Sequence, residues 1–375
     1  MFTRPTPFTV PAAEQQWVDA VAGLAPQFAA TVADDDAGAR LPIEHLQALH
    51  ATGLDAAFLP VEHGGDGLSY VTLVNIVRTL ATVHPALATV WLMHIGAAHA
   101  LVTLSSPEEG AFFAAELRAG KRFANALSEP AGGNLFLASQ QDASPTAAGW
   151  ALTGRKLFIS GSEIADYFFL NSRVDGNPAF FGVTVDDTVS FPPIQETMGM
   201  RATRSRTVEF AETPLLASRL CGIPPIDYAN LITVAFAFLS LGIAESALDL
   251  LTASAHTKKG PAPALADAQW VKMETGLLWT ETQAVLLLAE RVAWLADQRS
   301  TEAMAAATES KMLANELAKK AAAEAVRVGG GGSYLVTSPI QRVFRDAQAG
   351  ALMAYSVPFS QEVIGNAVLE ASAPA

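Results

Sequence analysis

The chain has a single cysteine, Cys221, among its 375 residues. One cysteine cannot form an intramolecular disulfide, so a hydrophobic core has to hold the fold, and this usage is typical of a reducing compartment. Charged residues are also scarce, at 16%, whereas hydrophobic residues make up 50%. This composition predicts a folded protein rather than a disordered one.

Positive charge is in deficit. The chain has 24 Lys and Arg against 37 Asp and Glu, for a formal net charge of -13. Affinity for nucleic acid comes largely from cations that neutralise phosphates, so a nucleic-acid partner is not expected. The seven histidines are scattered, and neither the His-x-x-x-His nor the Cys-x-x-Cys spacing occurs. No metal site is predicted.

Long hydrophobic runs are absent as well. The longest, residues 231–244, ends at Glu245 and is shorter than the roughly 20 residues that span a bilayer. We expect a buried helix there and no membrane span. The first residues, Met-Phe-Thr-Arg-Pro, have no apolar stretch typical of a signal peptide. Together with the cysteine usage, this favours a cytoplasmic location.

The pattern of apolar residues divides the chain into three zones, with expected boundaries at 1–121, 122–218 and 219–375. The first zone has helical spacing, and Pro42 and Gly53 suit the two ends of a helix over residues 41–50. The second has short aromatic and β-branched runs, including a predicted hairpin in 150–160 with a Thr-Gly turn. The third returns to long helical segments. The α–β–α order indicates an α+β fold, mainly α, ending in a helical bundle.

Four short segments carry a family resemblance. They are Pro-Val-Glu-His-Gly-Gly-Asp-Gly at 60–67, Ala-Leu-Ser-Glu-Pro-Ala-Gly-Gly at 126–133, Gly-Trp-Ala-Leu-Thr-Gly-Arg-Lys-Leu-Phe-Ile-Ser-Gly at 149–161, and Met-Gly-Met-Arg-Ala-Thr-Arg-Ser-Arg-Thr-Val-Glu-Phe at 198–210. An Arg-Asp-Ala motif follows at 345–347. In this order, over nearly the full length, the chain resembles acyl-CoA dehydrogenases. That resemblance implies an N-terminal helical domain, a middle β-barrel-like domain, a C-terminal four-helix bundle and bound FAD.

A flavin that accepts hydride develops negative charge on its pyrimidine ring, so the protein has to supply hydrogen-bond donors there. The resemblance implies that donors at Leu127 and Ser128 face that ring, that Ser160 places a hydroxyl near N5, and that Phe158 packs on the ring edge. The full set of expected cofactor contacts is Ala126, Leu127, Ser128, Gly133, Asn134, Phe158, Ile159, Ser160, Arg327, Gly330, Gly331 and Ser356.

The glycines of this set lie in a run at 329–332, where a backbone without side chains can approach a pyrophosphate closely. A plain helix break explains the same glycines. Arg327 stands where the family usually has Gln; it suits a phosphate partner or a solvated surface charge, and the sequence favours neither.

The resemblance fails at the catalytic base. In the family a glutamate commonly follows the Ala of the Arg-Asp-Ala motif by seven residues, and here that position is Ala354. The family's alternative base falls near residues 255–260, which contain no carboxylate; His256 is the one weak substitute there. The Arg-x-x-Phe-Gly segment, which reaches a neighbouring subunit's flavin in the family, is also absent.

Three functions follow from this. The first is an FAD-dependent oxidoreductase acting on the CH–CH group of an acyl thioester, carried by CoA or a carrier protein, with its base elsewhere and an electron-transfer partner for the flavin. The second is a flavin-dependent monooxygenase, for which a missing carboxylate is no loss. The third is a non-catalytic subunit of a hetero-oligomeric dehydrogenase. We rank them in this order. The resemblance also implies a homodimer or homotetramer.

Overall fold

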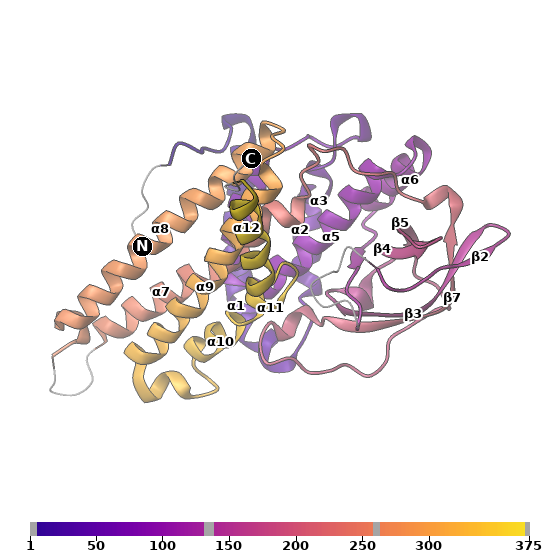
Figure 1. The fold of residues 1–375 in the computed structure, drawn as a ribbon. Helices are drawn as coiled ribbons and strands as arrows, with labels where there is room; N and C mark the ends of the chain where they lie inside the picture. Colours follow the sequence, from indigo (N-terminus) through magenta and orange to yellow (C-terminus); the bar gives the residue numbers. More distant parts are fainter. Residues whose placement is uncertain (1–5, 131–138, 258–262, 372–375) are drawn as a thin grey trace.

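The computed structural model describes residues 6–130, 139–257 and 263–371. Helices come first, strands second and helices last, and the strands gather at one end of an elongated helical body (Figure 1). This is the predicted α+β, mainly helical fold, which is confirmed.

The N-terminal part is helical and ends four residues before the first strand. Its helices are α1 (Gln15–Gly38), α2 (Ile43–Ala51), α3 (Leu54–Ala57), α4 (Tyr70–Val83), α5 (Pro85–Leu104) and α6 (Pro107–Arg118). The predicted helix over 41–50 is α2. Helix α5 begins with Pro85 in its first turn, and the side chain of His84 accepts a hydrogen bond from the Leu87 amide, which caps an otherwise unsatisfied donor.

The described residues of the middle part form seven strands in two sheets. They are β1 (Phe123–Ala126), β2 (Ser144–Thr146), β3 (Gly149–Ile159), β4 (Tyr167–Val174), β5 (Asn177–Thr184), β6 (Val189–Ser190) and β7 (Arg206–Leu216). One sheet has the order β1-β4-β5, with β1 parallel to β4, and the other has the order β2-β3-β7-β6. The two sheets share one core cluster between them.

The predicted hairpin within residues 150–160 is wrong. Strand β3 runs unbroken through that stretch, and both of its halves pair with β7 rather than with each other. The register shifts between Leu152 and Gly154, and the hydroxyl of the bulged Thr153 accepts a hydrogen bond from the Glu212 amide at 3.0 Å. A Thr-Gly pair therefore marks a bulge here, and the reversal lies at residues 147–148, between β2 and β3.

The C-terminal part contains α7 (Leu231–His256), α8 (Gln269–Asp297), α9 (Ala303–Gly329), α10 (Pro339–Asp346), α11 (Ala349–Leu352) and α12 (Val357–Ala371), with a 3-10 helix η7 (Gly330–Tyr334) at the glycine run. Helices α7, α8 and α9 pack on one another, and α4 packs on α7, so one core joins both helical ends of the chain.

Helices α5 and α7 are each long and apolar enough to cross a membrane. However, 78% of the apolar window of α5 and 94% of that of α7 lie buried inside the protein. A helix that is apolar on all sides is expected at the centre of a core. The buried helix predicted at residues 231–244 is thus the first half of α7.

Candidate functional site

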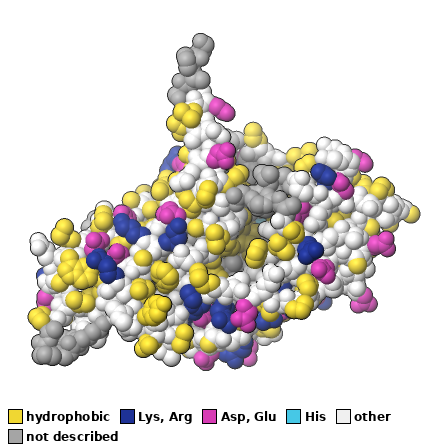
Figure 2. All heavy atoms as spheres, turned by 60° about the horizontal axis from the view of Figure 1, so that its bottom comes forward, with side chains coloured by type: hydrophobic (Ala, Val, Ile, Leu, Met, Phe, Trp, Pro, Cys, Tyr) yellow, Lys and Arg dark blue, Asp and Glu magenta, His cyan; other side chains and the backbone are white. Residues whose placement is uncertain are grey.

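A cavity of about 900 Å³ lies where the three parts of the chain meet. Its walls come from α5, from the residues that follow β1 and β3, from α7, and from residues 348–355. Hydrophobic side chains, yellow in Figure 2, surround a hollow near the middle of the face shown there. A large, mainly apolar cavity with a few polar groups is the usual form of a cofactor or substrate site.

Four of the predicted cofactor contacts line this cavity: Leu127, Ser128, Phe158 and Ser160. Leu127 and Ser128 directly follow β1, and the Ser128 carbonyl accepts a hydrogen bond from the Leu157 amide at 2.8 Å. Within the described residues, the amides of Leu127 and Ser128 and the Ser128 hydroxyl donate to no acceptor. Unpaired donors beside a cavity fit a ligand that accepts hydrogen bonds, as a flavin pyrimidine ring does.

Phe158 has an unusual backbone. Its φ is 56°, in the left-handed region that residues other than glycine rarely adopt, and its side chain is 63% exposed. Such strain persists only where the surroundings impose it, and it occurs often at ligand sites. Here it turns a phenyl ring into the cavity from the end of β3, where the resemblance expects an aromatic side chain beside the flavin.

Three hydroxyls lie in a row on the same wall. Ser160 Oγ is 2.8 Å from Ser205 Oγ, which is 2.8 Å from Thr203 Oγ1. Thr203 in turn donates to the Met200 carbonyl at 2.8 Å. All four residues line the cavity. The sequence pointed only to Ser160; the other hydroxyls sit in the matched segment 198–210, which no spacing rule tied to Ser160.

Ala354, the residue that the resemblance puts at the position of the family's usual base, also lines the cavity. Its amide donates to no acceptor in the described part of the chain. The loop that carries Ala354 is held from behind by Lys311, whose Nζ donates to the carbonyls of Gly350 at 3.0 Å and Tyr355 at 3.1 Å. Burial lowers the pKa of Lys311 to about 7, and sequence reasoning gave no sign of this residue.

Glu129 is the only carboxylate in the described cavity lining. Its Oε1 lies 2.5 Å from Nζ of Lys156, which is fully buried, and its Oε2 accepts the Gln140 amide at 2.8 Å. Burial alone would raise the pKa of Glu129, but the hydrogen bonds from Lys156 and Ser139 lower it below its usual range. A carboxylate held ionised and fully bonded in this way is a poor proton acceptor.

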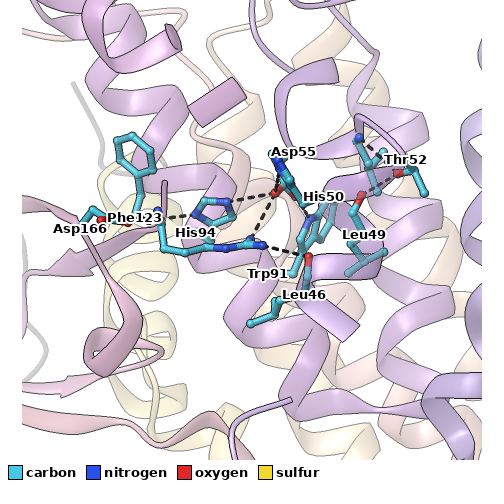
Figure 3. Close-up of polar contacts among 11 residues, drawn as sticks. Leu46, Leu49, His50, Thr52, Asp55, Trp91, His94, Phe123 and Asp166 are labelled. Atoms are coloured by element: carbon cyan, nitrogen blue, oxygen red, sulfur yellow. Dashed lines mark hydrogen bonds and ion pairs between the residues drawn. The ribbon is translucent and has the colours of Figure 1, made fainter. Parts of the chain in front are cut away.

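A buried network around Asp55 joins helices α3 and α5 to the start of β1 (Figure 3). Asp55 accepts hydrogen bonds from Trp91 Nε1 at 2.9 Å, His94 Nε2 at 3.4 Å and Arg122 at 3.2 Å. His94 Nδ1 accepts the Phe123 amide at 3.0 Å, so the proton of this ring is on Nε2. Burial lowers the pKa of His94, in agreement with a neutral ring. The network fixes the first residue of β1 against α5.

A second contact fixes β1 closer to the cavity. The side-chain amide of Asn125 donates to the Met93 carbonyl at 2.8 Å, and both residues line the cavity. Together with the Asp55 network, this contact sets the position from which Leu127 and Ser128 continue. The donors at the cavity wall therefore rest on a rigid support, which a preorganised binding site requires.

Other predicted contacts do not reach the cavity. Ala126 and Ile159 are buried in the core between the two sheets, at 0% and 1% exposure, because neighbouring residues of a strand face opposite sides. Ser356 is buried beside the cavity without lining it. Gly133 and Asn134 lie outside the described residues.

The remaining predicted residues lie elsewhere on the surface. Arg327, Gly330 and Gly331 are exposed at the end of α9, outside the cavity of their own chain. Arg327 already pairs with Glu324 at 2.6 Å. His256 is exposed at the end of α7 and does not line the cavity either, so it cannot reach a ligand bound there within one subunit.

Known proteins resemble this chain along its whole length. Residues 11–121 match the family model for the acyl-CoA dehydrogenase N-terminal domain, and residues 232–354 match the model for the C-terminal domain. The putative acyl-CoA dehydrogenase YdbM of Bacillus subtilis is 27% identical over 96% of this chain and 97% of its own. L-evernosamine nitrososynthase of a Micromonospora strain is 28% identical over 90% of this chain and 85% of its own.

The fold also matches solved structures. FMN-bound TdsC of Paenibacillus sp. A11-2, a dibenzothiophene monooxygenase, superposes with a TM-score of 0.85 at 21% identity, over 96% of this chain and 98% of its own. The two family models together span more than half of the chain. The chain therefore belongs to the acyl-CoA dehydrogenase superfamily of flavin oxidoreductases.

Proposed function

We propose that this chain is an FAD-dependent monooxygenase, in which reduced flavin and oxygen meet in the cavity and an uncharged substrate is oxidised. The observation that carries the proposal is the state of the acid–base groups in the described cavity lining. Ala354, which the resemblance puts at the usual base position, lines the cavity and has no side chain that can take a proton. Glu129 lines it too, but is ion-paired with Lys156. Desaturation of an acyl thioester needs a base for the α-proton, whereas oxygen chemistry on a flavin needs a dry pocket.

The tyrosines of the lining are no better as bases. Burial raises the pKa of Tyr228 to about 12 and also raises that of Tyr355, so both stay protonated at neutral pH. Arg345, the other charged group of the described lining, pairs with Asp36 at 2.5 Å and donates to the Met198 carbonyl at 2.7 Å. With neither charge free to pair with a ligand, the cavity favours an uncharged substrate.

The residues present fit a flavin. When bound, it would supply the redox chemistry, and the chain would position it and keep water out. The amides of Leu127 and Ser128, which donate to no acceptor within the described residues, would bind the ring edge that gains negative charge on reduction. Phe158 would cover the ring. Methionine and phenylalanine side chains, for example Met93 and Phe236, form much of the remaining wall. An apolar wall of this kind excludes water from the reacting atoms.

A specific observation supports a second candidate, the dehydrogenase that the sequence favoured. The amide of Ala354 makes no hydrogen bond within the described residues. In the family, the backbone amide at this position binds the thioester carbonyl, and that contact needs no side chain. A thioester bound there would still lack a group to take its proton, which is why we rank this candidate second.

The exposed glycine run gives a reason to propose a homodimer or homotetramer. Arg327, Gly330 and Gly331 lie outside their own cavity, so they would contact the pyrophosphate of FAD only in a neighbouring copy. Size-exclusion chromatography with light scattering tests this: a flavin-loaded monomer would contradict it. We also propose a cytoplasmic location, on the cysteine usage alone.

The test of function measures flavin and oxygen together. Purified protein is loaded with FAD, its visible spectrum is recorded, and a panel of acyl-CoAs is added without oxygen. We expect no bleaching. Externally reduced FAD is then mixed with oxygen and uncharged aromatic substrates, and incorporation of labelled oxygen into product is followed by mass spectrometry. Bleaching by an acyl-CoA would establish the dehydrogenase instead, and failure to bind flavin in any state would favour the non-catalytic subunit.

A further inference from the structure

The row of hydroxyls at the cavity wall has a defined direction. A hydroxyl carries one hydrogen and can donate one hydrogen bond while accepting others. The Met200 carbonyl cannot donate, so the hydrogen of Thr203, 2.8 Å away, points to it. Toward Ser205, the Oγ1 atom of Thr203 can therefore only accept a hydrogen bond.

The same reasoning passes along the row. Because Thr203 accepts, Ser205 has to donate to it across their 2.8 Å contact. Ser205 Oγ then has no hydrogen for Ser160, so Ser160 donates to Ser205 across the second 2.8 Å contact. The hydrogen of Ser160 is consequently engaged with Ser205, and the Ser160 oxygen presents only lone pairs to a ligand. An isolated serine would instead rotate to donate or accept as the ligand required.

We propose that Thr203 and Ser205 are positioning residues that hold the Ser160 hydroxyl as a hydrogen-bond acceptor, so that the cavity selects reduced flavin over oxidised flavin. The inference rests on the proposed function. Flavin N5 carries a hydrogen in the reduced ring and a lone pair in the oxidised ring. An acceptor at Ser160 pairs with the first and faces the second lone pair to lone pair, which costs a hydrogen bond.

The donors at the end of β1 support the same preference. The donors at Leu127 and Ser128 have no acceptor in the part of the chain that the structure describes, and they match the negative charge that reduction places on the pyrimidine ring. The donors at Leu127 and Ser128 fit the negative charge that reduction adds to the pyrimidine ring, and the acceptor at Ser160 fits the hydrogen that reduction adds to N5. The Thr203 hydroxyl is well placed to keep its direction, because this residue is only 4% exposed and has little access to competing water.

The experiment compares the dissociation constants of oxidised FAD and of anaerobically reduced FAD, by titration of the full-length protein. In the natural chain we expect the reduced form to bind more tightly. Thr203→Val and Ser205→Ala free the Ser160 hydroxyl to rotate, so the preference should fall about five- to tenfold, the worth of one hydrogen bond. Thr203→Ser keeps the terminal donor and should retain the preference.

The midpoint potential of the bound flavin provides a second readout, because the ratio of the two dissociation constants fixes it. A tenfold fall in preference lowers that potential by about 30 mV for a two-electron couple. A merely structural role would weaken both oxidation states equally and leave the ratio unchanged. Binding of both states with an unaltered ratio in Thr203→Val and Ser205→Ala overturns the inference, whereas loss of all flavin binding in the natural chain overturns the proposed function itself.

Discussion

The carboxylate of Asp346 accepts a hydrogen bond from the amide of Met200 at 2.6 Å. This contact joins the end of α10 to the loop that carries Gly199 and Met200 along the cavity wall. Asp346 is only 4% exposed, and burial raises its pKa to about 6, more than the nearby Arg345 and the Met200 amide lower it. A junction between the C-terminal helices and the β domain therefore depends on a carboxyl that titrates in the mildly acid range.

Stability should fall as pH rises through this range. The folded-state pKa of Asp346, about 6, lies above the ordinary value of 3.8, so the folded protein holds this proton more tightly than the unfolded chain. Protonated Asp346 therefore adds about 3 kcal/mol to the free energy of unfolding below about pH 4. This contribution is lost as the pH rises through about 6. Urea unfolding from pH 4 to 7 measures this. Asp346→Asn should reduce the change in the free energy of unfolding between pH 4 and pH 7. Asp34→Asn, at an exposed site, should leave that change as it is in the natural chain.

Gly199 should not tolerate a side chain. A Cβ at this position would lie 2.4 Å from the Arg345 carbonyl oxygen and 2.5 Å from its carbon. Backbone atoms cannot move aside as a flexible side chain can, so we expect Gly199→Ala to lower the free energy of unfolding by about 1–3 kcal/mol and to displace the cavity loop. Denaturant unfolding and flavin affinity both report the change.

A matched control for that variant is Gly276→Ala. Gly276 lies inside helix α8 and would place its Cβ in open space. Alanine there should stabilise the helix by about 0.5–1 kcal/mol without changing flavin affinity. Equal effects of the two substitutions would show that the contact with Arg345 relaxes at little cost.

Removal of Asp55 should be among the most damaging single changes in the N-terminal part. Asp55→Ala leaves Trp91, His94 and Arg122 without their shared acceptor in a site that is 2% exposed. The loss of one partner from a buried charge network typically costs about 3–5 kcal/mol. Thermal unfolding measures the loss. Asp55→Asn keeps one oxygen and the shape, and should be milder; an alanine variant as stable as the natural chain would mean that water replaces the carboxylate.

Ala354→Glu tests the meaning of the missing base. The new carboxylate would enter an apolar cavity without a cation to pair it, since Arg345 is already bonded to Asp36. We expect oxygen-dependent turnover to fall more than tenfold, in line with the cost of an unpaired charge in a dry site. Ala351→Glu, outside the lining, is the control. Gain of acyl-CoA-dependent flavin bleaching in Ala354→Glu would show that the cavity accepts thioesters and lacked only the base.

Much of the fold followed from the sequence because its signals are local. Helical spacing and flanking breaks located α2, and the apolar run located α7. The hairpin failed because pairing is not local: β3 takes β7 as its partner, more than fifty residues further along the chain. A Thr-Gly pair is compatible with both a turn and a bulge, and only the distant strand decides between them.

The site was predicted in part for a similar reason. Leu127, Ser128, Phe158 and Ser160 follow directly from strand ends in motifs, and these four do line the cavity. The hydroxyl row around Ser160 and the buried Lys311 depend on how separate elements meet in space. No spacing in the sequence predicts that Lys311 donates hydrogen bonds to two carbonyls of a loop about forty residues further along the chain.

The cavity draws its walls from Thr89 on α5, from the residues after β1 and β3, and from Tyr355, which follows α11. Walls that lie so far apart in the sequence meet only when the helical parts and the β part have packed on one another. The cavity is therefore a product of the whole fold and of no single part. A flavin bound there would raise the free energy of unfolding of all three parts together, because a ligand that binds only the folded state stabilises that state.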